Sequence, residues 1–343
     1  MNAHVYLKSY LAPFERWLSR PDVTDIWVNR PSEVWIESAS GQISCEAAPD
    51  VTETFLFRLA RQIAGSNNQG VNREQPLLSA SLPDGARVQI VAPPATRRGM
   101  ALAIRKHAIS NLSVEDLYCA GLFDRPADDR SSASTDADLE ALLATGDQLS
   151  FLKQAVFSRK TIVVSGGTSS GKTTLLNALL KLIDQGERLI VIEDTPEVKL
   201  EHPNSVGLIA VRGEMGEARV GVDALLEASL RMRPDRILLG ELRGKEAFTY
   251  LRAVNTGHPG SVTTVHADSP DAAIQQITMM ALLTGIGLDW LTVETYVRNV
   301  VDVIVQLKRT GKKRFVSEIA FTPRVAGQTK RRGSIASPKS RLE

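Results

Sequence analysis

Cysteines and aromatic residues are both scarce in this sequence. Its 343 residues include two cysteines, Cys45 and Cys119, and aromatic residues make up 5% of the chain. Two cysteines so far apart form no metal-binding spacing and cannot supply a four-cysteine zinc module, and they favour a reducing compartment. The low aromatic content argues against a protein that holds single-stranded nucleic acid by base stacking.

Long apolar runs and a strong net charge are absent as well. No stretch of about 18 apolar residues occurs. The nearest, Ile277–Val293, is interrupted by Gly285, Gly287 and Asp289, and it predicts a buried helix followed by a turn. The formal net charge is +2, so any surface that attracts nucleic acid or lipid must be local. The N-terminal segment has no apolar core of the signal-peptide kind, so we expect a cytoplasmic protein.

The character of the sequence changes three times along the chain. Residues 1–110 alternate short extended patterns with a helical pattern, which predicts a small α+β domain. Residues 111–150 are rich in Asp, Ser and Ala and predict a flexible linker. Residues 151–323 have the rhythm of an α/β domain, and residues 324–343 predict a basic, disordered tail.

The α/β domain is predicted from apolar strands that alternate with helical patterns. Strands are expected at Thr161–Ser165, Arg188–Ile192, Arg236–Gly240 and Val262–Val265. Helices are expected to begin near Lys172, Val222, Gly244 and Pro270. Because a helix between two strands returns the chain to the same end of the sheet, we expect a sheet of mainly parallel strands.

A glycine-rich segment follows the first of these strands and matches the phosphate-binding pattern G-x-x-x-x-G-K-[ST]. Its residues are Gly166, Gly167, Thr168, Ser169, Ser170, Gly171, Lys172, Thr173 and Thr174. Glycines let backbone N–H groups surround phosphate oxygens, and the start of the next helix adds a positive dipole. Lys172 would place a charge on the β- and γ-phosphates of ATP, and the Thr173 hydroxyl would bind Mg²⁺. The alternative is a glycine-rich turn without a ligand, and the flanking strand and helix argue against it.

The other expected strands each end in a residue that can take part in chemistry: Glu193, Glu241 and His266. Ligands of open parallel sheets bind at the carboxyl ends of strands, so we expect these side chains to converge on the phosphate site. Glu241 would serve Mg²⁺, directly or through water, and Glu193 would orient or deprotonate the attacking water, although the choice of general base stays open. His266 would sense the γ-phosphate, and a structural histidine is the alternative.

The chemical segments follow one another in a fixed order: phosphate loop, acidic segment, second acidic segment, histidine segment. They span Gly166–Thr174, Arg188–Glu197, Arg231–Gly244 and Thr256–Asp268. In this order and wording the chain resembles the secretion or traffic ATPases. Two N-terminal segments, Pro83–Pro94 and Leu102–Lys106, make it most similar to the hexameric ATPase of type IV secretion systems. The likeness covers roughly Leu11 to Phe321.

The resemblance implies a RecA-like P-loop NTPase domain preceded by a smaller α+β domain. It also implies a homo-hexamer that uses ATP and Mg²⁺ to drive channel or pilus assembly and the export of DNA or protein. Such a motor works with other secretion-system subunits, peripherally at the cytoplasmic face of the bacterial inner membrane. In the nucleotide site of this family, Glu193 would be the catalytic carboxylate and Glu241 would complete the metal site. Arg87 and Arg105 would reach the phosphates from the N-terminal domain. A surface role is the alternative for either arginine.

Ser169 departs from the wording of that family, which more often has glycine there. If the position needs a positive φ, serine is strained. Two other functions also stay open: a nucleic-acid-translocating motor on the same core, and a nucleotide-gated scaffold with little turnover. A pilus or type II secretion ATPase often carries a four-cysteine zinc module, which this chain cannot form.

Two expectations concern assembly and location. As a loose coil, residues 111–150 could reach roughly 35 Å, enough to cross to an adjacent subunit. Arg87 and Arg105 are therefore expected to serve the phosphate loop of a neighbour. The basic segments Lys308–Arg314 and Lys330–Arg341 could bind anionic lipid, and a merely solvated tail is the alternative.

Overall fold

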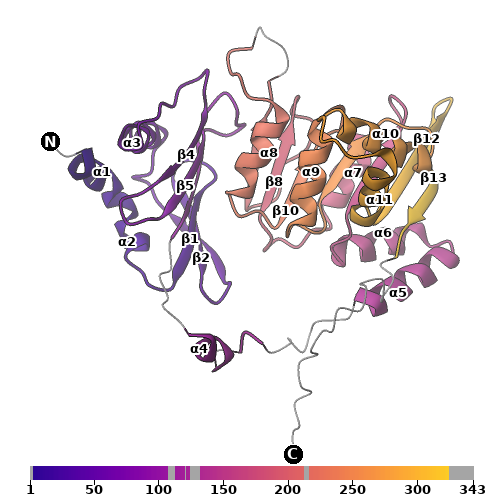
Figure 1. Cartoon of the computed structure of the whole chain (residues 1–343), viewed down its shortest axis with the longest axis horizontal. Coiled ribbons are helices and arrows are strands. Elements are labelled where there is room, and N and C mark those ends of the chain that lie inside the picture. The colour runs from indigo at the N-terminus through magenta and orange to yellow at the C-terminus, as the bar shows by residue number, and fades with distance from the viewer. Residues whose placement is uncertain (1–2, 107–112, 120, 124–131, 212–215, 324–343) are drawn as a thin grey trace, which may run out of the picture.

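The protein consists of two domains that lie side by side (Figure 1). The computed structural model describes residues 3–106, 113–119, 121–123, 132–211 and 216–323. The N-terminal domain is drawn in indigo and purple, and the larger C-terminal domain runs from pink to yellow. Within the described ranges, no helix is both long and apolar enough to cross a lipid bilayer.

The N-terminal domain is an antiparallel sheet with helices on one face. Its strands are β1 (Val23–Val28), β2 (Glu33–Ser38), β3 (Ile43–Ala47), β4 (Leu77–Ser81), β5 (Arg87–Val91) and β6 (Ala101–Arg105). They are ordered β3-β2-β1-β6-β5-β4. The covering elements are α1 (Ala3–Leu11), the 3₁₀ turn η1 (Ala12–Phe14), α2 (Glu15–Leu18) and α3 (Glu53–Ser66). Thr52 begins α3 by accepting the backbone N–H of Phe55 on its hydroxyl, which is the usual side-chain cap.

The other face of this sheet is buried against the C-terminal domain. Along β1, Ile26 and Val28 belong to the core beneath the helices, whereas Trp27 between them belongs to the core of the C-terminal domain. On β6, Leu102 belongs to the core beneath the helices and Ala103 to the core of the C-terminal domain. Successive side chains of a strand point to opposite faces, so these runs of consecutive apolar residues give the sheet two buried faces.

The C-terminal domain contains a seven-stranded sheet ordered β13-β12-β7-β11-β10-β8-β9. Its strands are β7 (Ile162–Gly166), β8 (Leu189–Glu193), β9 (Ser205–Ile209), β10 (Arg236–Leu239), β11 (Val262–Val265), β12 (Val303–Thr310) and β13 (Lys313–Phe321). Neighbouring strands run parallel except for the terminal β12–β13 hairpin. The expected parallel sheet is therefore confirmed, while β9, β12 and β13 were not among the expected strands.

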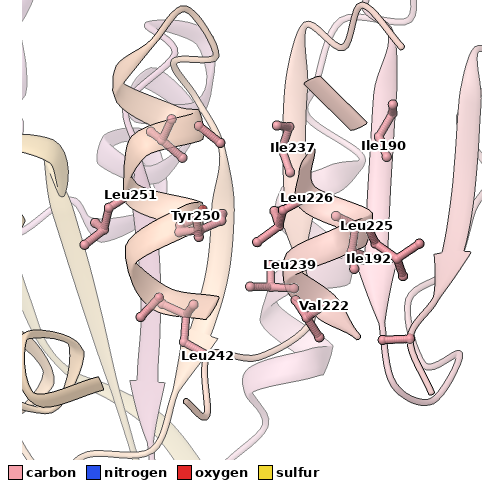
Figure 2. Close-up of a cluster of buried hydrophobic side chains, with 14 of the residues drawn as sticks. Ile190, Ile192, Val222, Leu225, Leu226, Ile237, Leu239, Leu242, Tyr250 and Leu251 are labelled. Atoms are coloured by element: carbon pink, nitrogen blue, oxygen red, sulfur yellow. The ribbon is translucent and has the colours of Figure 1, made fainter. Parts of the chain in front are cut away.

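Helices cover both faces of this sheet. One face carries α6 (Gln148–Phe157) and α7 (Lys172–Leu180), and the other carries α8 (Val222–Leu230), α9 (Glu246–Asn255), α10 (Pro270–Leu282) and α11 (Trp290–Val300). Figure 2 shows the second face, where Ile190 and Ile192 of β8 meet Leu225 and Leu226 of α8. Val191, between the two isoleucines, packs on the opposite face. Burial on both faces explains why these strands are largely apolar.

The segment expected to be a flexible linker is partly helical and packed. It contains α4 (Val114–Cys119) and α5 (Ser132–Ala144), and α6 begins before its end. Leu139 of α5 is fully buried in the core that includes Phe151 of α6. Leu142 and Leu143 pack against the same core, and the buried Asp136 of α5 forms an ion pair with Lys160. For residues 132–150 the prediction of a flexible linker is therefore wrong. Residues 124–131 and the basic tail 324–343 lie outside the described residues.

A buried polar contact joins the two domains. Arg188, at the entry to β8, is fully buried and donates from Nη1 to Asn29 Oδ1 and to Asn204 Oδ1, both at 2.7 Å. Its guanidinium carbon lies 4.5 Å from the ring centroid of Trp27. Burial lowers the pKa of Arg188 to about 9. Nearby, Arg233 forms an ion pair with Glu37 across the same boundary. These contacts place the N-terminal domain beside the β9 edge of the sheet.

Candidate nucleotide-binding site

Four neighbouring strands end at one cavity of about 460 Å³. β7 leads into the phosphate loop, β8 ends in Glu193, β10 is followed by Glu241, and β11 is followed by His266. Residues Thr168–Thr174 and all three of these side chains line the cavity. The structure thus brings together the strand-end residues expected to converge, because β7, β11, β10 and β8 are adjacent and parallel.

The phosphate loop turns through two left-handed residues. Gly171 caps α7 with φ 101°, and Ser169 has φ 58°. The loop therefore does require a positive φ at Ser169, where a side chain costs roughly 1–2 kcal/mol relative to glycine. The carbonyl oxygen of Ser169 accepts a hydrogen bond from Nε of Arg314, at 3.0 Å. This contact holds the strained peptide from outside the loop.

Arg314 is a site residue that the sequence did not reveal. It lies on β13, 145 positions from Ser169, and it lines the cavity. In the sequence it stood within the basic segment Lys308–Arg314, which was interpreted as a lipid contact. No local pattern separates it from its basic neighbours, so only the packing of the β12–β13 hairpin beside β7 shows its position.

Lys172 lies within the loop that carries it. Its Nζ donates to the carbonyl oxygens of Gly166 and Gly167, at 2.9 and 3.2 Å. The same nitrogen is 3.3 Å from Nε2 of His266. Burial lowers the pKa of Lys172, and the charge of Glu241 opposes that shift. The present partners of Lys172 Nζ are two carbonyl oxygens and a histidine nitrogen, and phosphate oxygens would replace them on binding.

Glu241 stands at the centre of a chain of charged groups. One carboxylate oxygen is 2.8 Å from Nε2 of His266, and the other accepts a hydrogen bond from Nε of Arg243 at 2.7 Å. This hydrogen bond raises the pKa of Arg243, which also lies 3.6 Å from Asp194. His266 therefore bridges Glu241 and Lys172, which suits a residue that responds to phosphate.

The acidic segment places its two glutamates differently from our expectation. Glu193 is buried, forms an ion pair with Arg97, and accepts the backbone N–H groups of Glu197 and Val198 on Oε1, at 2.9 and 2.8 Å. Glu197 instead accepts the hydroxyl of Thr173 on Oε2, at 2.9 Å. Glu197 was not among the residues expected to take part in chemistry. Its position, four residues after Glu193 in the same acidic segment, was the available signal.

Arg87 and Arg105 lie away from this cavity. They line a second cavity of about 560 Å³ together with Gln89 and Arg231, and Arg105 donates to Asp25 Oδ1 at 2.9 Å. The residues that line the phosphate-loop cavity all fall between positions 168 and 314. The described structure thus does not bring either arginine to the phosphate loop of its own chain.

The oxygen donors at the cavity suit a magnesium–nucleotide complex. Thr173, Glu197 and Glu241 offer a hydroxyl and two carboxylates. Among the described residues, however, no group of three or more His, Cys, Asp and Glu side chains could hold a metal ion by itself. Mg²⁺ is usually held by one or two protein oxygens together with water and substrate phosphates, so this donor set fits it.

Comparison with known proteins gives the family. Residues 8–336 match the model of the type II/IV secretion system proteins. The chain belongs to this family. It is 40% identical to the type IV secretion system protein VirB11 of Bartonella quintana over 328 residues, which cover 91% of this chain and 92% of that protein. It is 39% identical to PtlH of Bordetella pertussis over 320 residues, covering 91% and 94%.

A solved structure agrees with the assignment. The VirB11 ATPase of the Brucella suis type IV secretion system, crystallised with sulphate, superposes with a TM-score of 0.86 at 36% identity. The match covers 93% of this chain and 95% of that one. This member of the secretion-system family is thus a nucleotide-binding ATPase, a motor of the type IV secretion kind, and the RecA-like fold expected from the sequence is confirmed.

Proposed function

We propose that the phosphate-loop cavity hydrolyses Mg²⁺–ATP with the following division of labour. Lys172 binds the β- and γ-phosphates, and Thr173 with Glu197 or Glu241 holds the metal, which neutralises charge on the transferring phosphoryl group when bound. Of Glu241 and Glu197, the one that does not serve the metal orients the attacking water. Glu193 remains a catalytic candidate from the sequence, but both of its oxygens are engaged in this arrangement.

The contact between Thr173 and Glu197 carries this proposal. In a phosphate loop the hydroxyl after the lysine is the protein's metal ligand. A carboxylate 2.9 Å from that hydroxyl lies beside the expected metal position. Lys172 and His266 line the same cavity, so Lys172 can meet the phosphates while Thr173 and Glu197 meet the metal.

Phosphate release and nucleotide binding, measured on purified variants, test these roles. Lys172→Ala should abolish hydrolysis and weaken ATP binding, because it removes the charge aimed at the phosphates. Glu197→Gln and Glu241→Gln should bind ATP yet turn over at least about a hundredfold more slowly, and the sequence predicts the same of Glu193→Gln. Near wild-type turnover in Lys172→Ala would overturn the site assignment.

Glu201→Gln is a matched control for the glutamate variants. Glu201 lies shortly after the acidic segment Arg188–Glu197, but its side chain is 63% exposed. It forms a surface ion pair with Lys181, with 3.5 Å between Oε2 and Nζ. Its turnover should stay within about threefold of wild type, since surface ion pairs contribute little. A wild-type protein that binds ATP but releases no phosphate would support the nucleotide-gated scaffold instead.

We also propose that the active form is a homo-hexamer in which Arg87 and Arg105 reach the phosphate loop of a neighbouring subunit. Their position in a separate cavity of the same chain supports supply between subunits. An added arginine stabilises charge on a transferring phosphoryl group, which gives the arrangement a chemical purpose. Light scattering with and without ATP and Mg²⁺ measures the ring size, and a protein that stays monomeric in every condition would contradict the proposal.

The partners and location proposed for this motor follow its relatives. The named relatives are components of type IV secretion systems, so we propose that this chain works with other secretion subunits at the cytoplasmic face of the inner membrane, driving export of DNA or protein. Stimulation of phosphate release by purified inner-membrane secretion subunits, but not by single-stranded DNA alone, would support this over a nucleic-acid-translocating motor.

A further inference from the structure

The N-terminal domain adds a short extended segment to the C-terminal sheet. Residues 95–98 run along β9, where Thr96 forms an antiparallel bridge with Leu208. The backbone N–H of Arg97 donates to the carbonyl oxygen of Gly207 at 3.0 Å. This backbone pairing fixes the direction in which the Arg97 side chain leaves the N-terminal domain.

The Arg97 side chain ends at the acidic segment of the nucleotide site. Its guanidinium forms an ion pair with Glu193 and donates from Nη1 to the carbonyl oxygen of Val198, at 2.6 Å. The Arg97 side chain is 13% exposed and that of Glu193 is 3% exposed. Water screens a pair this deeply buried only weakly, so each charge depends strongly on the other.

Glu193 in turn contacts the backbone of the loop that follows β8. Its Oε1 accepts the N–H groups of Glu197 and Val198, which ties the loop backbone to the carboxylate. The Glu197 side chain of the same loop then accepts the Thr173 hydroxyl. A continuous series of polar contacts therefore runs from Arg97 in the N-terminal domain to the phosphate loop.

We propose that Arg97 is a positioning residue for ATP hydrolysis and acts through Glu193. By neutralising and anchoring that buried carboxylate, Arg97 fixes the loop that presents Glu197 to Thr173. Arg97 is not among the residues that line the phosphate-loop cavity, so its effect is indirect. The inference rests on the proposed hydrolytic function, and it makes turnover at each site depend on the N-terminal domain of the same chain.

This role differs from the one proposed for Arg87 and Arg105. Those residues face a separate cavity, whereas Arg97 reaches the acidic segment of its own chain. One N-terminal domain would thus serve two nucleotide sites, its own through Arg97 and a neighbour's through the other arginines.

The first test compares Arg97→Ala with Arg98→Ala in steady-state phosphate release and in binding of a fluorescent ATP analogue. Arg98 is the matched control because it crosses the same boundary, donating to Leu200 O at 2.6 Å, and is not paired with Glu193. Arg97→Ala should lower kcat about 10- to 100-fold, because a displacement of about 1 Å in a positioned group can cost about a hundredfold. The Kd for the analogue should change less than about threefold, and Arg98→Ala should leave kcat within about threefold.

Two further variants separate positioning from a loss of structure. Arg97→Lys keeps the charge but not the forked donor, so it should fold and recover part of kcat even if Arg97→Ala is unstable. Arg97→Ala combined with Glu193→Gln should be no slower than the slower single variant, because both changes break one series of contacts. Equal losses in Arg97→Ala and Arg98→Ala, or multiplying losses in the double variant, would overturn the proposal.

Lys172→Ala, assayed in parallel, keeps the two proposals distinguishable. If Lys172→Ala is inactive while Arg97→Ala and Arg97→Lys turn over normally, the positioning role fails and the ATPase site stands. If Lys172→Ala remains active, the proposed site itself fails and the Arg97 proposal fails with it.

Discussion

Replacement of Arg188 tests how firmly the two domains are joined. In Arg188→Met an unbranched apolar side chain remains, but Asn29 Oδ1 and the carbonyl oxygen of Met232 lose the donors that Arg188 supplies. Each buried acceptor left without a partner costs about 1–3 kcal/mol. Burying the positive charge of Arg188 also destabilises the folded protein, and the lowering of the Arg188 pKa to about 9 reflects this. Arg188→Met no longer buries a charge, so this gain offsets part of the loss.

The expected net loss is about 2–3 kcal/mol in the free energy of unfolding, or a fall of about 3–4 °C in Tm for a chain of this length. Urea unfolding followed by tryptophan fluorescence is a direct assay, since Trp27 lies beneath the Arg188 guanidinium. Arg61→Met, at an exposed position of α3, is the control and should stay within about 0.5 kcal/mol.

Second-site changes identify the cause of the loss. Asn204 Oδ1 accepts from Arg188 and also from Asn29 Nδ2, so both amide acceptors must be removed together with the donor. Arg188→Met combined with Asn29→Leu and Asn204→Leu should therefore be more stable than Arg188→Met alone. An Arg188→Met protein with the wild-type urea midpoint would refute the reasoning. Such a result would mean that the free-energy cost of burying the Arg188 charge equals the stabilisation from the hydrogen bonds of Arg188.

Three further predictions concern assembly, pH and lipid. Mixed rings of Lys172→Ala and Arg105→Ala should regain some phosphate release if arginines are supplied between subunits, whereas no recovery in rings shown to be mixed would exclude that arrangement. Burial lowers the pKa of His202 and His258 below the unfolded value of 6.5. The unfolded chain therefore binds more protons as the pH falls below about 6.5, so Tm should drop between pH 7.5 and 5.5, and less so in His202→Gln/His258→Gln. Flotation with anionic vesicles should weaken at high salt if the Lys308–Arg314 segment attracts lipid, and association that ignores salt would contradict that view.

Much of the site could be read from short patterns. The phosphate loop is a contiguous motif, and its chemistry depends on residues that stay together in any fold. Glu193, Glu241 and His266 could be placed from their positions at strand ends, because parallel strands present their carboxyl ends at one edge. Even the strain at Ser169 could be anticipated, since glycine is the residue that a positive φ favours.

Other parts depended on which elements become neighbours. The order of strands puts β12 beside β7, which brings Arg314 to the phosphate loop from a distant part of the sequence. The packing of helix α5 could not be foreseen from a polar, low-complexity stretch, because it depends on contacts of Leu139 with a distant core and of Asp136 with Lys160. These are contacts between segments, and no local periodicity records them.

The sequence by itself determined the kind of chemistry, the phosphate loop and the parallel sheet, because these follow from contiguous motifs and from repeating apolar patterns. Only the tertiary structure decided which acid faces Thr173 and which arginines share its cavity. Glu193 and Glu197 lie in one short segment, yet the contact from Arg97 directs the first inward and leaves the second beside the phosphate loop. That outcome depends on how the N-terminal domain packs against β9, and packing between distant segments is fixed only when the whole chain folds.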